Sequence, residues 1–277
     1  MKTNILYAIA FATILTSCTG GGEKKTEDTS QSSEVVKKVV GKEVSYKADT
    51  TTMNGYIAND ESIDGKKPGI LVIHEWWGHN EYTRKRADML AELGYVAMAV
   101  DMYGNGKQAA HPEDAGKFSG QVFSNMEGAK ARFEAALSTL KSNPNVDTSK
   151  IAAIGYCFGG SVALTMANAG YDLDAVAAFH SGVQLPIQPS GNLDTRILVQ
   201  NGADDPMVSD ESVTSFKASM EAANATYEYI SYPEAVHAYT NPGATALGEK
   251  FGLPLAYNKQ ADEKSWAKMK SFLAASF

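Results

Sequence analysis

The chain passes from an apolar run into a glycine-rich turn at Ile151-Ala152-Ala153-Ile154-Gly155-Tyr156-Cys157-Phe158-Gly159-Gly160. The β-branched run predicts a strand, and residues 160–169 carry the apolar spacing of a helix. A strand that turns tightly into a helix needs glycine on either side of the turn, because side chains would clash there. In this context the pattern G-x-C-x-G is that of a nucleophile elbow whose nucleophile is Cys157.

On both sides of this turn, buried strands alternate with helices. Strands are expected at residues 69–74, 95–101, 150–157, 175–180, 196–200 and 226–232. Helices are expected at 82–93, 124–141, 160–169, 210–223 and 258–275, and an edge hairpin at 43–47 and 51–58. The alternation predicts an α/β fold with a mostly parallel central sheet and helices on both faces. Together with the elbow this is the α/β-hydrolase arrangement, whose chemistry lies at the carboxyl ends of the strands.

The bulk composition is that of one globular domain. The chain has 277 residues, of which 44% are hydrophobic and 21% charged, and this length suits one large α/β domain. A domain of this size buries enough surface to fold without disulfides or metals. The formal charge is −7 with both signs interspersed, and no basic face is visible. This excludes a nucleic-acid partner.

The N-terminal residues have the features of an export signal. An apolar run at 5–15 is too short to span a bilayer, and it closes with Leu15-Thr16-Ser17-Cys18. That ending resembles the lipobox of bacterial lipoproteins, in which the cysteine becomes the lipidated first residue of the mature chain. The alternative is an ordinary signal peptide that contains a cysteine.

We therefore expect a signal peptide at 1–17, the lipidated Cys18 with a flexible polar tether at 18–42, and the hydrolase domain at 43–277. The lipid would anchor an exported protein on the periplasmic or cell-surface side of a membrane. Thr19, rather than aspartate, follows the cysteine, which favours the outer membrane.

An elbow nucleophile requires an acid and then a histidine further along the chain. The spacing G-x-x-D-x-x-V after the strand at 196–200 selects Asp205 as the acid, with Asp204 as the second choice, although either could be only a turn former. His237 follows the last strand in the position of the base. Its imidazole would take the thiol proton while the acid fixes its tautomer. The other interpretation of Cys157 is a buried structural cysteine.

The loop that follows the strand at 69–74 is expected to complete an oxyanion hole. Backbone N–H groups of Trp76 and Phe158 would hold the developing negative charge, and Trp77 would form an apolar pocket wall. The loop contains the pattern H-E-x-x-x-H from His74 to His79. This is not the zinc pattern H-E-x-x-H on a helix, so neither a metal nor another cofactor is expected.

The chain resembles the dienelactone hydrolase family from about residue 43 to the C-terminus. The resemblance rests on five motifs, which are His74–Gly78, Asp101–Tyr103, Gly155–Gly160, Gly202–Val208 and Glu234–Tyr239. It implies an esterase that acts through a Cys-His-Asp triad. It also implies that Glu75 contacts the resting thiol and receives its proton when substrate enters, which would protect the thiol from oxidation.

The chain departs from that family in its charged substrate contacts. Family members that open dienelactone hold its carboxylate with arginines, one of them four residues after the histidine, where this chain has Asn241. An asparagine cannot supply a bidentate charged clamp. The expected substrate is therefore another small ester, thioester or lactone, in a pocket formed by Trp77, Tyr103, Tyr239 and Asn241.

Two other kinds of protein are considered. One is a ligand-binding lipoprotein on an inactive hydrolase fold. The other is a redox-active thiol protein, against which the absence of a resolving cysteine in the mature chain weighs. The sequence leaves the oligomeric state open.

Overall fold

The computed structural model describes residues 37–277, which form an eight-stranded mixed sheet in the order β1-β2-β4-β3-β5-β6-β7-β8. Strands β3 to β8 run parallel, and β1 and β2 add an antiparallel edge. The strands are β1 Val39–Ala48, β2 Thr51–Asp60, β3 Lys67–Ile73, β4 Val96–Val100, β5 Val146–Tyr156, β6 Ala175–Phe179, β7 Arg196–Gly202 and β8 Tyr227–Tyr232.

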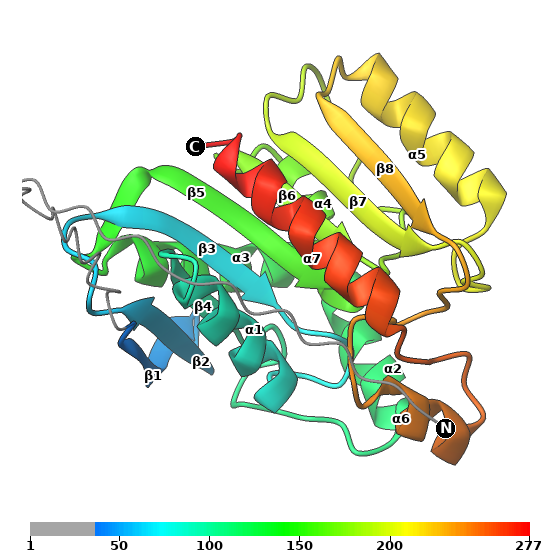
Figure 1. Ribbon diagram of the computed structural model, residues 1–277, viewed down its shortest axis with the longest axis horizontal. Helices are drawn as coiled ribbons and strands as arrows, with labels where there is room; N and C mark the ends of the chain where they lie inside the picture. Colours follow the sequence, from blue (N-terminus) through cyan, green and yellow to red (C-terminus); the bar gives the residue numbers. More distant parts are fainter. Residues whose placement is uncertain (1–36) are drawn as a thin grey trace, which may run out of the picture. The chain divides into compact units, whose positions relative to one another are not determined.

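Helices cover both faces of the sheet (Figure 1). They are α1 Glu81–Ala91, α2 Pro112–Phe123, α3 Met126–Lys141, α4 Phe158–Asn168, α5 Asp210–Ala222, α6 Ala244–Phe251 and α7 Lys259–Ala274. One core cluster packs α3, α4 and α5 against the sheet, and a second packs α1 and α7 against the opposite face. The central strands are apolar along their length because both faces are buried.

The predicted fold class is confirmed, and each predicted strand and helix is present near its expected position. The hairpin of β1 and β2 begins at Val39, so the first strand includes residues that we expected in the tether. Helices α2 and α6 were not predicted. The expected signal peptide and the expected lipidation of Cys18 lie outside the described residues. None of the helices between residues 37 and 277 combines the length and hydropathy that a membrane crossing requires.

The elbow between β5 and α4 has the predicted tight geometry. Cys157 has φ 53° and ψ −117°, a backbone conformation that non-glycine residues seldom adopt. A Cβ atom on Gly155 would lie 2.1 Å from the carbonyl oxygen of Gly159, and one on Gly159 would lie 2.4 Å from that of Ile73. Both contacts are with backbone, which cannot rotate away. The glycines therefore allow α4 to start directly above the end of β3.

Replacing Gly155 with alanine is expected to destabilise the protein by at least the roughly 1–3 kcal/mol that is typical of overpacked sites. Gly120→Ala in α2 is the matched control, since nothing lies within 4 Å of its added Cβ. That variant is expected to be stabilised by about 0.5–1 kcal/mol, because alanine favours the helix. Urea unfolding of both variants measures the difference. Equal stabilities would contradict this account of the elbow.

Candidate active site

Three side chains meet at the carboxyl ends of β5, β7 and β8. Cys157 lies on the elbow after β5, Asp205 on the loop after β7, and His237 on the loop after β8. His237 Nε2 is 3.0 Å from Cys157 Sγ, and its Nδ1 is 2.8 Å from Asp205 Oδ2. The neighbouring Asp204 is exposed and does not reach the histidine. The topology therefore brings the predicted trio together in a continuous hydrogen-bonded line.

The environment of His237 favours its protonated form. The ring is 5% exposed. Burial opposes the charge, but the anionic charges that Cys157 and Asp205 can carry outweigh burial, and the pKa of His237 is raised to about 10. Cys157 itself is half-buried, so its sulfur remains accessible. A half-accessible thiol beside a cationic imidazole is the environment of a reactive cysteine.

The two backbone N–H groups predicted to form the oxyanion hole, those of Trp76 and Phe158, have no hydrogen-bond acceptor among the described residues. Phe158 is the first residue of α4, where the helix dipole adds a partial positive charge. The Tyr103 hydroxyl donates to the Trp76 carbonyl at 2.9 Å and so fixes the loop after β3 that carries Trp76. Both groups are thus available in the predicted oxyanion hole.

Glu75 is buried at the edge of this site and is held by Asn241. The Asn241 Nδ2 donates to Glu75 Oε2 at 2.6 Å, and the Asn241 Oδ1 accepts from the Gly243 N–H at 2.9 Å. Burial raises the pKa of Glu75 to about 7, against the opposing effects of Asn241 and the charge on His237. The hydrogen-bond contact of the Cys157 thiol is with His237. The thiol contact that the family resemblance implies for Glu75 is absent from the described residues.

The buried carboxyl of Glu75 predicts a loss of stability as the pH rises. Its folded pKa lies above its ordinary value of 4.5, so the folded state binds the proton more tightly than the unfolded chain. The stabilisation is complete below about pH 4.5 and is lost as the pH rises through about 7. Glu75→Gln should therefore weaken this pH dependence. Urea midpoints of both proteins at pH 5 and pH 7.5 measure it, and parallel curves would contradict the assignment.

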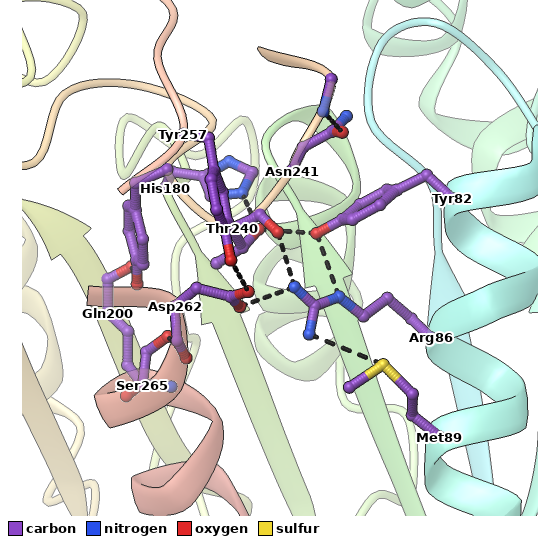
Figure 2. A network of polar contacts seen from close by, with 12 residues as sticks. Tyr82, Arg86, Met89, His180, Gln200, Thr240, Asn241, Tyr257, Asp262 and Ser265 are labelled. Carbon is purple, nitrogen blue, oxygen red and sulfur yellow. Dashed lines mark hydrogen bonds and ion pairs between the residues drawn. The ribbon is translucent and has the colours of Figure 1, made fainter. Parts of the chain in front are cut away.

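A buried polar network is centred on Arg86 and Thr240 (Figure 2). Arg86 of α1 donates at 2.6 Å both to the carbonyl oxygen of Thr240 and to Asp262 Oδ1 of α7. The Thr240 hydroxyl is 2.6 Å from the Tyr82 hydroxyl and 2.7 Å from His180 Nε2. Thr240 is three residues after His237 in the chain. The network therefore connects the segment that carries His237 to helices α1 and α7.

The four residues of the predicted substrate pocket are all buried, and their role in substrate binding stays a prediction. Tyr239 is fully buried and its hydroxyl donates to the backbone of Gln200, so it belongs to the core. Trp77 is buried against Phe251, and Tyr103 and Asn241 are engaged by the contacts described above. A cavity of about 890 Å³ lies beside the loops that follow β6 and β7.

The histidines of the H-E-x-x-x-H pattern have structural partners. His74 Nδ1 is 2.5 Å from the Glu75 carbonyl oxygen, and its Nε2 accepts from the Met102 N–H. His79 accepts from Arg84. Within residues 37–277, no group of three or more His, Cys, Asp or Glu side chains is placed to hold a metal ion.

Several residues of the site were not found by sequence reasoning. Arg86, Thr240 and Asp262 had no motif to mark them, and the cavity residues come from three separate helices and loops. Only Arg86 could have been noticed in the sequence, because the whole chain has only four arginines. An arginine on the apolar face of a predicted helix indicates a buried partner.

A parallel sheet with a strained cysteine elbow, followed in order by an aspartate and a histidine, defines the α/β-hydrolase class. Residues 53–277 match the model of the Dienelactone hydrolase family. The chain therefore belongs to the Dienelactone hydrolase family, a family of carboxylic ester hydrolases.

Known relatives extend this comparison. The chain is similar to Protein usf of Aquifex pyrophilus, with 29% identity over 73% of this chain and 88% of the relative. A candidate carboxymethylenebutenolidase of Aquifex aeolicus is 27% identical over the same shares of the two chains. Among solved structures, a dienelactone hydrolase-like promiscuous phosphotriesterase from metagenomic libraries is 32% identical, with a TM-score of 0.80 over 86% of this chain and 99% of that one.

Proposed function

We propose that the protein hydrolyses carboxylic esters or lactones, with Cys157 as nucleophile, His237 as base and Asp205 as the residue that orients the histidine. The observation that carries the proposal is the line of contacts from Asp205 through His237 to Cys157, at 2.8 and 3.0 Å. Nucleophile, base and orienting acid within hydrogen-bond reach are the requirement for covalent catalysis.

The first half of the reaction acylates the thiol. His237 Nε2 takes the thiol proton, and the sulfur attacks the carbonyl carbon of the ester. A C–S bond forms, and the carbonyl electron pair moves to an oxyanion that the N–H groups of Trp76 and Phe158 stabilise. The oxyanion collapses, the C–O bond to the alcohol breaks, and the imidazolium returns the proton to the departing alkoxide.

The second half frees the enzyme by hydrolysis. His237 takes a proton from water, whose oxygen attacks the thioester carbon. Collapse of this second oxyanion breaks the C–S bond, releases the acid, and leaves the proton to return to Cys157. Asp205 keeps the imidazole in the tautomer whose Nε2 faces the sulfur throughout.

The substrate is proposed to differ from that of relatives described as carboxymethylenebutenolidases. Asn241 stands where the dienelactone-opening members have an arginine, and its amide is engaged by Glu75 at 2.6 Å. It therefore has neither the charge nor the freedom to bind a substrate carboxylate. A small ester, thioester or lactone without that carboxylate fits the chain better.

We also propose that the protein is exported and anchored in a membrane through a lipid on Cys18. The support is the apolar run at 5–15 followed by Leu15-Thr16-Ser17-Cys18. Metabolic labelling of a bacterial culture with an alkynyl fatty acid tests this, with Cys18→Ser as the control. Label that depends on Cys18 is expected. An unlabelled wild-type chain would reject the proposal.

The hydrolase proposal is tested with esters, thioesters and lactones against the wild type, Cys157→Ser and His237→Ala. Turnover by the wild type and its loss in both variants are expected, with normal folding by circular dichroism. A ligand-induced rise in melting temperature without turnover of any compound would indicate a binding protein instead.

A further inference from the structure

The cavity of about 890 Å³ has walls from four parts of the chain. They are the end of α2, the start of α4, the loop after β6, and the loop that leads from β7 into α5. The residues that matter here are Phe123, Ser161, Val183, Leu185, Met207 and Phe216. A volume of this size is typical of small-molecule sites, and it lies at the sheet edge where ligands of α/β proteins bind.

Two contacts and one shared helix connect the cavity wall to the proposed catalytic residues. Met207 in the wall donates its backbone N–H to Asp205 Oδ1 at 2.9 Å. The Phe123 ring packs edge-on against Phe158, with 5.2 Å between the ring centres. Ser161 lies one helical turn after Cys157 and donates to the carbonyl oxygen of Gly182 at 2.7 Å. The wall thus includes residues of the acid loop and of the helix that follows the nucleophile, and it packs against Phe158 of the proposed oxyanion hole.

The lining has no positive charge that could bind an anion. Of the residues that line the cavity within the described chain, Glu211 is the only ionisable one. The other members are apolar side chains, prolines, serines, glutamines and Gly182. A carboxylate in this cavity would lose its hydration without gaining a charged partner, and Glu211 would repel it.

The exposed Met207 at the rim of the cavity also favours an uncharged ligand. Met207 is 50% exposed, and it is one of three large hydrophobic side chains among the described residues that are so open to solvent. An unbranched thioether adapts its shape to irregular apolar ligands. A ligand that covers Met207 would remove apolar surface from water.

We propose that this cavity holds an uncharged, elongated arm of the ester substrate, and that it makes the enzyme prefer neutral, chain-bearing esters to esters whose arm ends in a carboxylate. The inference rests on the proposed function and names the substrate class of that same site. Each CH₂ of the arm that leaves water is expected to raise kcat/KM roughly threefold to fourfold.

The experiment compares two ester series, one of 4-nitrophenyl esters with acyl arms from acetate to octanoate and one of acetate esters with alkyl arms of the same lengths. Ser215→Trp fills the cavity from an exposed position on α5. Ala218→Trp adds the same ring to an exposed position on the same helix outside the lining and is the matched control. The rate on 4-nitrophenyl acetate measures the chemical step, because its arm is too short to fill the cavity. The change of kcat/KM with arm length measures binding of the arm in the cavity.

The wild type and Ala218→Trp are expected to favour long arms in at least one series, whereas Ser215→Trp loses that preference and keeps its rate on 4-nitrophenyl acetate. An arm that ends in a carboxylate should react at least tenfold more slowly than the neutral arm of equal length, and Glu211→Lys should narrow that gap. If neither series shows a chain-length preference that Ser215→Trp removes, the cavity proposal is wrong.

Failure of the underlying function has a different signature. In that case 4-nitrophenyl acetate is not hydrolysed by the wild type, or is hydrolysed equally by Cys157→Ala. Hydrolysis of the acetate that depends on Cys157, with no effect of Ser215→Trp on either series, would reject the cavity assignment alone.

Discussion

Cys157→Ala is expected to lower kcat for a short activated ester by roughly 10⁴-fold to 10⁶-fold, the range known for removal of a nucleophile from a catalytic triad. The reason is that no other described side chain occupies the position that faces His237 Nε2 at 3.0 Å. Steady-state release of 4-nitrophenol from 4-nitrophenyl acetate measures the effect. Alkylation of the wild type with iodoacetamide should cause a loss of similar size.

The control for Cys157→Ala is its folding, which should be unchanged or slightly improved. The strained backbone at this position, with φ 53° in the wild type, accepts alanine as it accepts cysteine. The side chain is half-buried, so its removal is expected to leave no large cavity. An unchanged urea midpoint together with lost turnover assigns the loss to chemistry. Retention of more than about a tenth of the wild-type rate would show that the thiol is not the nucleophile.

Asp262→Ala is expected to destabilise the protein by about 3–5 kcal/mol, because it leaves the charge of Arg86 buried without its partner. The Arg86 side chain is 4% exposed, and its Nη2 donates to Asp262 Oδ1 at 2.6 Å. The aromatic rings of Tyr82, Tyr156 and Trp266 surround the guanidinium at 5.2 to 5.4 Å and exclude water from it. Urea unfolding measures the loss.

The next residue of the same helix provides the comparison. Glu263 pairs with Lys259 across one turn at 3.7 Å, and both side chains are mostly exposed. Glu263→Ala is expected to cost at most about 0.5 kcal/mol, since surface pairs contribute little. If the two alanine variants unfold at the same urea concentration, the buried network does not hold the histidine loop in the way described.

Local signals in the sequence were sufficient for the fold and for the three side chains, Cys157, Asp205 and His237, that the fold brings into contact. The run before Cys157 and the glycines around it specify the elbow, because the clash of a Cβ atom with nearby backbone is a local property. The order of nucleophile, acid and histidine then follows from the strand order of the fold. The spacing favoured Asp205 over Asp204 but left Asp204 as the second choice. In the structure Asp204 is exposed, whereas Asp205 contacts His237.

The contacts of Glu75 and Asn241 could not be predicted, because they join residues 166 positions apart. The sequence indicated that Asn241 replaces a charged clamp, but not that its amide would bind a buried carboxyl. The family resemblance implied a contact between Glu75 and the thiol, which the described residues do not have. Long-range side-chain contacts of this kind depend on tertiary packing, which the hydrophobic periodicity of the sequence does not specify.

The cavity beside the loops after β6 and β7 could not be predicted for a similar reason. Aromatic residues near motif positions were expected to line the substrate pocket, yet Tyr239 is fully buried in the core. The cavity is built from the loop after β6 and the start of α5. The conformations of the loops after the strands determine where a cavity forms. Loop sequences are variable and contain few patterns from which a conformation can be predicted.

Trapping the acyl-enzyme identifies the nucleophile. The wild type is mixed rapidly with excess 4-nitrophenyl ester, quenched in acid, and digested for peptide mass spectrometry. The account predicts a burst of one 4-nitrophenol per chain and an acyl group on the peptide that contains Cys157, with neither in Cys157→Ala. A burst whose acyl group lies on another residue, or turnover without any acylated peptide under conditions where deacylation is slow, would contradict it.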